Sequence, residues 1–147
     1  MTHKRWAALA AMTLSLSACE PPLEGTWEIV EFRRPGISAM GDQEASLWLG
    51  RTLVVTDSTA TMGADTCAVA DVTRETLPVR SIEMGFNAMP GDLGIAKERV
   101  DLFEIVCGQG FLTAGQQIIR LARDSVLTPW DGVFFLMVRR AGDGSGG

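Results

Sequence analysis

The chain has 147 residues, and 13 basic and 18 acidic side chains give it a formal net charge of −5. A protein that binds nucleic acid needs a clustered basic footprint, so this acidic balance argues against a nucleic-acid partner. The only histidine is His3 and tyrosine is absent, so the body of the chain cannot use imidazole as a general base, metal ligand or pH switch.

The first 18 residues are typical of an export signal. Lys4 and Arg5 supply positive charge, residues 6–16 form an apolar run, and small residues follow. This run is about half of the roughly 20 apolar residues that a membrane-spanning helix needs, so we expect the segment to be removed. The alternative is an ordinary secretory signal followed by an incidental cysteine.

The run Leu16-Ser17-Ala18-Cys19 resembles the lipobox of bacterial lipoproteins at all four positions. The resemblance implies cleavage before Cys19, a thioether-linked diacylglycerol on its sulfur and an acyl group on the new amino terminus. Several acyl chains together give stable membrane anchoring. Glu20, in the place where aspartate implies inner-membrane retention in enterobacterial lipoproteins, implies an outer-membrane protein, which we expect to face the periplasm.

The mature chain divides into a short tether at 19–23, one domain at 24–140 and a Gly-rich, disordered tail at 141–147. Short β-type runs separated by turn residues predict a mainly β domain, a small antiparallel up-and-down barrel of about eight strands with one short helix. The runs that predict strands are 24–34, 51–56, 60–62, 67–72, 79–86, 99–107, 111–112, 117–122, 126–127 and 133–140.

The predicted helix follows the first strand. Asp42 is its expected N-cap, Ala45, Trp48 and Leu49 share one face at helical spacing, and Gly50 ends it. Turns are expected at 35–36, 57–58, 90–92 and 128–132, where proline, glycine, aspartate or serine is frequent.

Cys67 and Cys107 are the two cysteines left once Cys19 carries lipid. Exported proteins mature in an oxidising compartment, so the sequence predicts a disulfide that closes a loop of about 40 residues. The alternative, a redox or metal pair, has neither a C-x-x-C spacing nor a histidine to support it.

The segment Leu23-Glu24-Gly25-Thr26-Trp27-Glu28-Ile29 resembles the G-x-W opening of lipocalin-like barrels. It is also similar to the start of META-domain heat-shock lipoproteins and of bacterial alkaline-protease inhibitors, and the run 131–136 looks like the last hairpin of META-type domains. The resemblance implies that Gly25 permits strand entry and that Trp27 plugs one end of a barrel.

Methionine and aromatic side chains could line an apolar cavity or a partner surface, or simply fill the core. Four of them are candidate contacts for a ligand or a partner, namely Met84, Phe86, Met89 and Trp130. The acidic residues Glu28, Glu31, Asp101 and Glu104 are dense enough to suggest a glycosidase pair, but acids dispersed along strands are usually solvated. We therefore expect no catalytic residue, metal or cofactor.

These observations predict a non-enzymatic, lipid-anchored lipoprotein of the outer membrane. Its expected activity is the binding of an apolar small ligand or of an envelope protein. The alternative is an inhibitor of an envelope-directed protease or lysozyme, which the resemblance to the protease inhibitors motivates.

Overall fold

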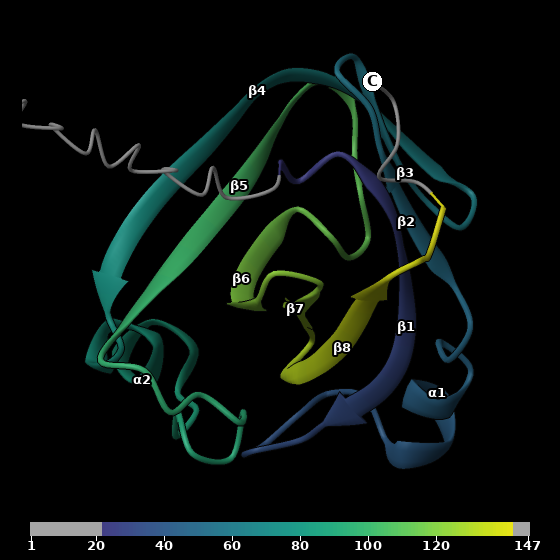
Figure 1. Cartoon of the computed structure of the whole chain (residues 1–147). Helices are drawn as coiled ribbons and strands as arrows, with labels where there is room; N and C mark the ends of the chain where they lie inside the picture. The colour runs from purple at the N-terminus through teal and green to yellow at the C-terminus, as the bar shows by residue number, and fades with distance from the viewer. Residues whose placement is uncertain (1–21, 143–147) are drawn as a thin grey trace, which may run out of the picture.

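A computed structural model describes residues 22–142, which form a closed antiparallel barrel (Figure 1). Each strand pairs with the next in the chain, and β8 pairs with β1, so the predicted eight-stranded up-and-down barrel is confirmed. The signal segment, Cys19 and most of the expected tail lie outside the described residues. The strands are β1 (Gly25–Arg33), β2 (Thr52–Val55), β3 (Thr59–Met62), β4 (Asp65–Pro78), β5 (Arg99–Gly110), β6 (Gln117–Ala122), β7 (Ser125–Trp130) and β8 (Val133–Arg139), and the helices are α1 (Asp42–Ser46) and α2 (Arg80–Phe86).

Side chains fill the interior of the barrel. Because successive residues of a strand point to opposite faces, every second apolar residue faces inward. The largest fully buried members of this interior cluster are Trp27, Ile29, Leu53, Ile105, Ile118, Phe135 and Met137. The protein core is therefore the barrel interior itself.

The chain reaches the barrel through Leu23, which is buried although the tether was expected to extend to this residue. Its carbonyl oxygen accepts a hydrogen bond of 2.8 Å from the indole Nε1 of the fully buried Trp27. A buried indole N–H needs such an acceptor, so the packed part of the chain begins before β1.

The helix after β1 is present, but it is shorter than predicted. Its N-cap is Gly41 rather than Asp42, and the helix ends at Ser46. Trp48 continues the buried face by stacking on Phe135 at a ring-centroid distance of 5.1 Å, whereas Leu49 is exposed. The predicted face was thus wrong at Leu49, because the chain leaves the helical path after one turn.

The prediction of a strand at 79–86 was wrong, because this segment forms α2. Its apolar residues fit two periods: Ile82, Met84 and Phe86 alternate, but Val79, Ile82 and Phe86 also recur at helical spacing. In the structure Ile82 is fully buried and Met84 is 82% exposed, as the helical period requires. Asn87, with a left-handed φ of 50°, ends the helix.

Two further segments differ from the sequence-based expectation. Phe111 and Leu112 belong to the loop between β5 and β6, because Gly110 with a φ of 76° turns the chain out of the strand. The expected turn at 128–132 involves only Asp131 and Gly132, whose φ values of 49° and 79° fit the two-residue turn that joins twisted hairpin strands.

A second apolar cluster covers the outer face of β5 to β8. α2 and the loop that follows it pack there, as Figure 1 shows at its lower left. The cluster comprises Ile82, Ala88, Leu93, Ile95, Val100, Ile119, Leu127 and Phe134. Between residues 22 and 142, neither helix is long and apolar enough to cross a bilayer.

Candidate functional site

A pocket of about 410 Å³ lies at the end of the barrel where β1 begins. This pocket, called the mouth pocket below, is bordered by the incoming chain, by the turn between β2 and β3 and by the middle of β4. Its lining residues are Pro22, Leu23, Glu24, Val55, Thr56, Asp57, Val69, Ala70, Asp71, Val72, Arg74 and Phe103.

The strand register shows which lining residues of the mouth pocket face the barrel interior. Val69 pairs with Cys107, Val72 with Ile105 and Arg74 with Phe103. Ile105 is fully buried in the interior cluster, so its partner Val72 and the next alternate residue, Arg74, face the same interior. The mouth pocket is therefore the unfilled end of the barrel interior.

Two arginines flank the aromatic floor of the pocket. The guanidinium carbons of Arg74 and Arg120 lie 5.6 and 4.9 Å from the ring centroid of Phe103. Both distances are within the range of a cation–π interaction. Arg120 is only 4% exposed, so the interior contains a buried cation next to the pocket.

Asp101 supplies a compensating negative charge. It accepts hydrogen bonds from Thr76 Oγ1 at 2.5 Å and from Arg74 Nη2 at 2.8 Å. Burial raises the pKa of Asp101, but these two hydrogen bonds and the charges of Arg74 and Arg120 together lower it below its ordinary value of 3.8. The carboxyl group is therefore ionised at neutral pH, and its hydrogen bond holds the guanidinium of Arg74 in place.

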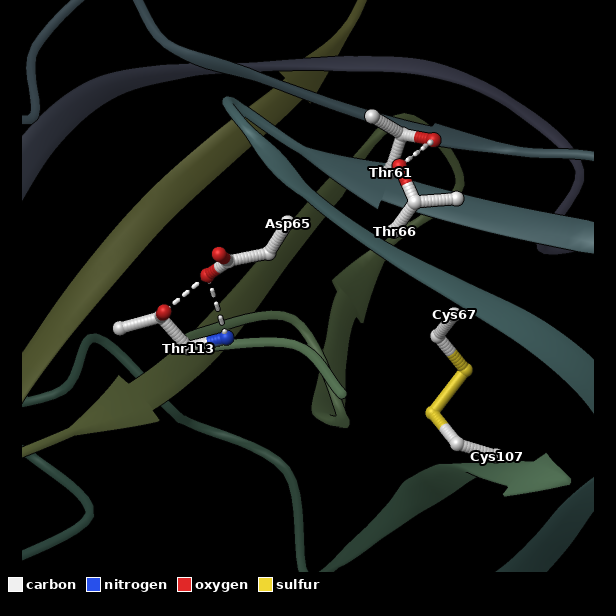
Figure 2. Close-up of a disulfide and its surroundings, with 6 residues drawn as sticks. All are labelled: Thr61, Asp65, Thr66, Cys67, Cys107 and Thr113. Carbon is white, nitrogen blue, oxygen red and sulfur yellow. Dashed lines mark hydrogen bonds between the residues drawn. A yellow bond between two sulfur atoms is a disulfide. The ribbon is translucent and has the colours of Figure 1, made fainter. Parts of the chain in front are cut away.

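The predicted disulfide between Cys67 and Cys107 is confirmed (Figure 2). It joins β4 to β5 with a Cα–Cα distance of 5.5 Å. The register of these strands shifts on both sides of Val69, so the bridge lies beside an irregular part of the ladder. It therefore holds together the two strands that supply Val72, Arg74 and Phe103 to the mouth pocket.

The four predicted contact residues do not form one site, and none of them lines the mouth pocket. Met84 is 82% and Met89 is 56% exposed, and they lie on α2 and in the loop after it. Phe86 instead packs edge-on against Phe134 at a centroid distance of 5.9 Å. Trp130 lines a separate cleft of about 270 Å³ at the end of β7.

The acidic residues considered for catalysis are dispersed. Glu28 pairs with Arg140 and Glu31 with Arg33, each at 2.8 Å, and Asp101 is held inside the barrel. In the part of the chain that the structure describes, no three histidine, cysteine, aspartate or glutamate side chains are grouped so that they could hold a metal ion.

The sequence pattern did not identify Val72, Arg74 and Phe103 as site residues. It ended the fourth strand at Val72, whereas β4 continues to Pro78. Residues 73–76 instead continue β4 and pair with residues 101–104 of β5. The alternation of Val72, Arg74 and Thr76 was the signal that could have identified this inner wall.

Comparisons with protein-family models, with curated proteins and with solved structures found no match.

Proposed function

We propose that the protein is a non-enzymatic binding module of the cell envelope, anchored to the outer membrane by lipid on Cys19 and facing the periplasm. Its ligand is an apolar small molecule held in the mouth pocket. The observation that supports this function best is the apolar, inward-facing wall of Val55, Val72 and Phe103 at the unfilled end of an otherwise packed barrel.

The size and chemistry of the mouth pocket suit a small ligand. Its volume of about 410 Å³ lies within the range of roughly 300–1,000 Å³ that is common for small-molecule sites. Burying apolar surface of a ligand there contributes about 25 cal/mol per Å², whereas the charged Arg74 and Asp71, which also line the pocket, favour a polar group on the ligand. These features together favour a mainly apolar molecule with one polar end.

The proposed anchor would keep the mouth pocket near the membrane. Pro22, which lines the pocket, follows Cys19 by three residues, and an extended chain spans at most about 3.3–3.6 Å per residue. The lipid would thus attach within about 11 Å of Pro22. An apolar ligand could then pass between the bilayer and the pocket over a short distance.

Photolabelling in membranes tests the proposed ligand class. A palmitic acid analogue with a diazirine group would be added to membranes that contain the full-length protein, and labelled peptides would be identified after irradiation. We expect labels on residues 69–74 and on Phe103, and competition by unlabelled palmitate. Labels that are confined to the outer face of the barrel would contradict the proposal.

Binding of an envelope protein is the second candidate, and the exposure of Met84 favours it. Exposed methionines form adaptable contact surfaces, and a second exposed methionine, Met89, follows in the loop after α2. A photoreactive amino acid at position 84 should then cross-link a single envelope protein, whereas one at the exposed Val54 of β2 should not. An inhibited protease or lysozyme as the captured protein would select the inhibitor alternative.

A further inference from the structure

A second cleft lies at the opposite end of the barrel from the mouth pocket. It has a volume of about 270 Å³ and lies between β5, β6, β7 and the loop that joins β5 to β6. The register fixes its position: Arg33, at the far end of β1, pairs with Phe134, and Phe134 pairs with Pro129. Its lining residues are Glu104, Leu112, Thr113, Ala114, Gln116, Gln117, Pro129 and Trp130, and we call it the Trp130 cleft.

The polar side chains of the Trp130 cleft have hydrogen-bonding groups that the protein does not use. Within residues 22–142, the carboxylate of Glu104, the amides of Gln116 and Gln117 and the indole N–H of Trp130 form no hydrogen bond or ion pair. The lining of the cleft thus combines two amides and one carboxylate with an aromatic ring.

The backbone that carries these side chains is held firmly. The carbonyl oxygen of Gln116 accepts a hydrogen bond of 2.8 Å from the N–H of Ile105. The fully buried hydroxyl of Thr128 donates to the carbonyl oxygen of Gln117 at 2.9 Å and accepts from the N–H of Gly115 at 2.8 Å. The cleft is therefore formed before a ligand arrives, which lowers the entropic cost of binding.

A second anchor fixes the other end of the same loop. The carboxylate of Asp65 accepts hydrogen bonds from both the backbone N–H and the hydroxyl of Thr113 (Figure 2). Asp65 lies at the start of β4, so the loop between β5 and β6 is tied to a strand on the other side of β5. Thr113 and Thr128 thus fix the loop at both ends.

The chemistry of the cleft fits a sugar ring better than an apolar or an anionic ligand. An apolar ligand would leave the amides and the carboxylate desolvated and unpaired, which costs about 1–3 kcal/mol for each group. An anion would be repelled by Glu104. A pyranose offers an apolar C–H face to an indole ring, hydroxyl donors to a carboxylate and hydroxyl acceptors to amides.

We propose that the Trp130 cleft binds one pyranose unit of a neutral saccharide. Trp130 packs against the sugar face, Glu104 accepts hydrogen bonds from its hydroxyls, and the amides of Gln116 and Gln117 donate to its oxygens. The saccharide can be a free oligosaccharide or part of the cell-wall glycan. Since the cleft lies at the far end of the barrel from Pro22, the proposed anchor would point it away from the membrane; the binding itself does not depend on that anchor.

Binding is tested with the full-length protein in a zwitterionic detergent that has no sugar group. Chitotriose and maltotriose are the probes, and the indole ¹H–¹⁵N resonance of Trp130, assigned with a Trp130→Phe variant, is the readout. We expect that one of the two probes shifts this resonance in a saturable way. A resonance that does not move at about 10 mM of either probe, where even affinities of only a few mM would be visible, would overturn the proposal.

Because Trp130 also packs against the core, replacing it would disturb folding as well as binding. The binding test therefore uses substitutions at surface residues of the cleft. Gln117→Ala and Glu104→Ala should each weaken binding by about 3- to 10-fold, the loss of one hydrogen bond. Gln109→Ala, on the exposed end of β5 and outside the cleft, is the matched control and should bind like the unchanged protein. Equal affinities in all three variants would overturn the assignment.

Two further measurements define the ligand. Co-sedimentation with purified cell-wall sacculi, reversed by the free probe, would support a polymeric glycan, and binding of the free probe alone would support a soluble oligosaccharide. Choline tests the competing possibility of an organic cation held by Trp130 and Glu104. A shift with choline and with neither saccharide would contradict the proposal.

Discussion

The guanidinium of Arg139 lies 4.2 Å from the ring centroid of Trp27. The two residues pair across β1 and β8, the strands whose pairing closes the barrel. Arg139 Nη2 also donates to the carbonyl oxygen of Pro22 at 2.7 Å, so this one side chain joins the last strand, the core tryptophan and the incoming chain.

Replacing Arg139 should therefore destabilise the barrel. A cation–π contact contributes about 0.5–2 kcal/mol and a hydrogen bond from a charged group about 1.5–3 kcal/mol, so we expect Arg139→Ala to lower the free energy of unfolding by roughly 2–4 kcal/mol. Urea unfolding followed by tryptophan emission measures this change. Arg140→Ala, which removes the exposed ion pair with Glu28, is the control and should cost less than about 1 kcal/mol. Equal costs would contradict the role given to Arg139.

The disulfide should contribute substantially to stability. On the chain-entropy model, a bridge between residues 40 positions apart stabilises the fold by about 4 kcal/mol. We expect Cys67→Ser with Cys107→Ser to lower the free energy of unfolding by up to that amount. Thiol titration after unfolding checks the bonding state: the lipidated protein should show no free thiol before reduction and two after it. Two free thiols before reduction would disprove the bridge.

The ionised state of Asp101 makes stability depend on pH. Its pKa is lowered in the folded protein, so its contribution is complete above its ordinary value of 3.8 and is lost as the pH falls through the folded value. We expect Asp101→Asn to cost about 1–3 kcal/mol at pH 7, because two hydrogen bonds to a charged group are weakened. The difference in the free energy of unfolding between the variant and the unchanged protein should shrink as the pH falls below 3.8.

Urea unfolding at pH 7 and at several acidic pH values measures the difference in the free energy of unfolding between Asp101→Asn and the unchanged protein. Asp42→Asn removes a carboxylate from an exposed ion pair with Arg34 and is the control, with an expected cost below about 1 kcal/mol at pH 7. If the cost of Asp101→Asn is the same across the whole acidic range, the carboxylate does not act through its charge.

The turn between β7 and β8 should tolerate no side chain at Gly132. Its φ is 79°, and a Cβ there would lie 2.7 Å from the carbonyl oxygen of Ile37. We expect Gly132→Ala to cost at least about 1–2 kcal/mol, the strain of a left-handed L-residue alone. A Cβ at Gly91 would meet no atom within 4 Å, and the φ of Gly91 is not positive, so Gly91→Ala should be neutral or slightly stabilising. Urea unfolding of both variants measures these changes, and equal costs at the two positions would contradict the strain at Gly132.

Two substitutions in α2 distinguish the helix from the strand that the sequence suggested. In a strand Ile82 and Met84 would share a face, but in α2 Ile82 is fully buried and Met84 is 82% exposed. Ile82→Ala should cost about 2–5 kcal/mol, and Met84→Ala should stay within about 0.5 kcal/mol of the unchanged protein. Similar large costs at both positions, measured by urea unfolding, would favour the strand.

Local patterns predicted the barrel because most strands alternate and end at clear turns. The alternation of residues 99–107 and the Asp-Gly turn before Val133 are examples, and both elements are present. The pattern failed at 79–86, where two periods fit the same residues and only packing against Phe134 decides between them. The mouth pocket was missed for a similar reason, since Arg74 and Phe103 become neighbours through strand pairing and not through closeness in sequence.

A pair of matched valine variants tests the proposed ligand site most directly. Val72 and Val106 are 38% and 37% exposed and lie on the neighbouring strands β4 and β5, but only Val72 lines the mouth pocket. Photolabelling of the membrane-bound protein with the palmitic acid analogue should lose most of its signal at residues 69–74 in Val72→Trp, because the indole fills the pocket, and keep it in Val106→Trp. Equal labelling in the two variants would contradict an apolar ligand in the barrel mouth.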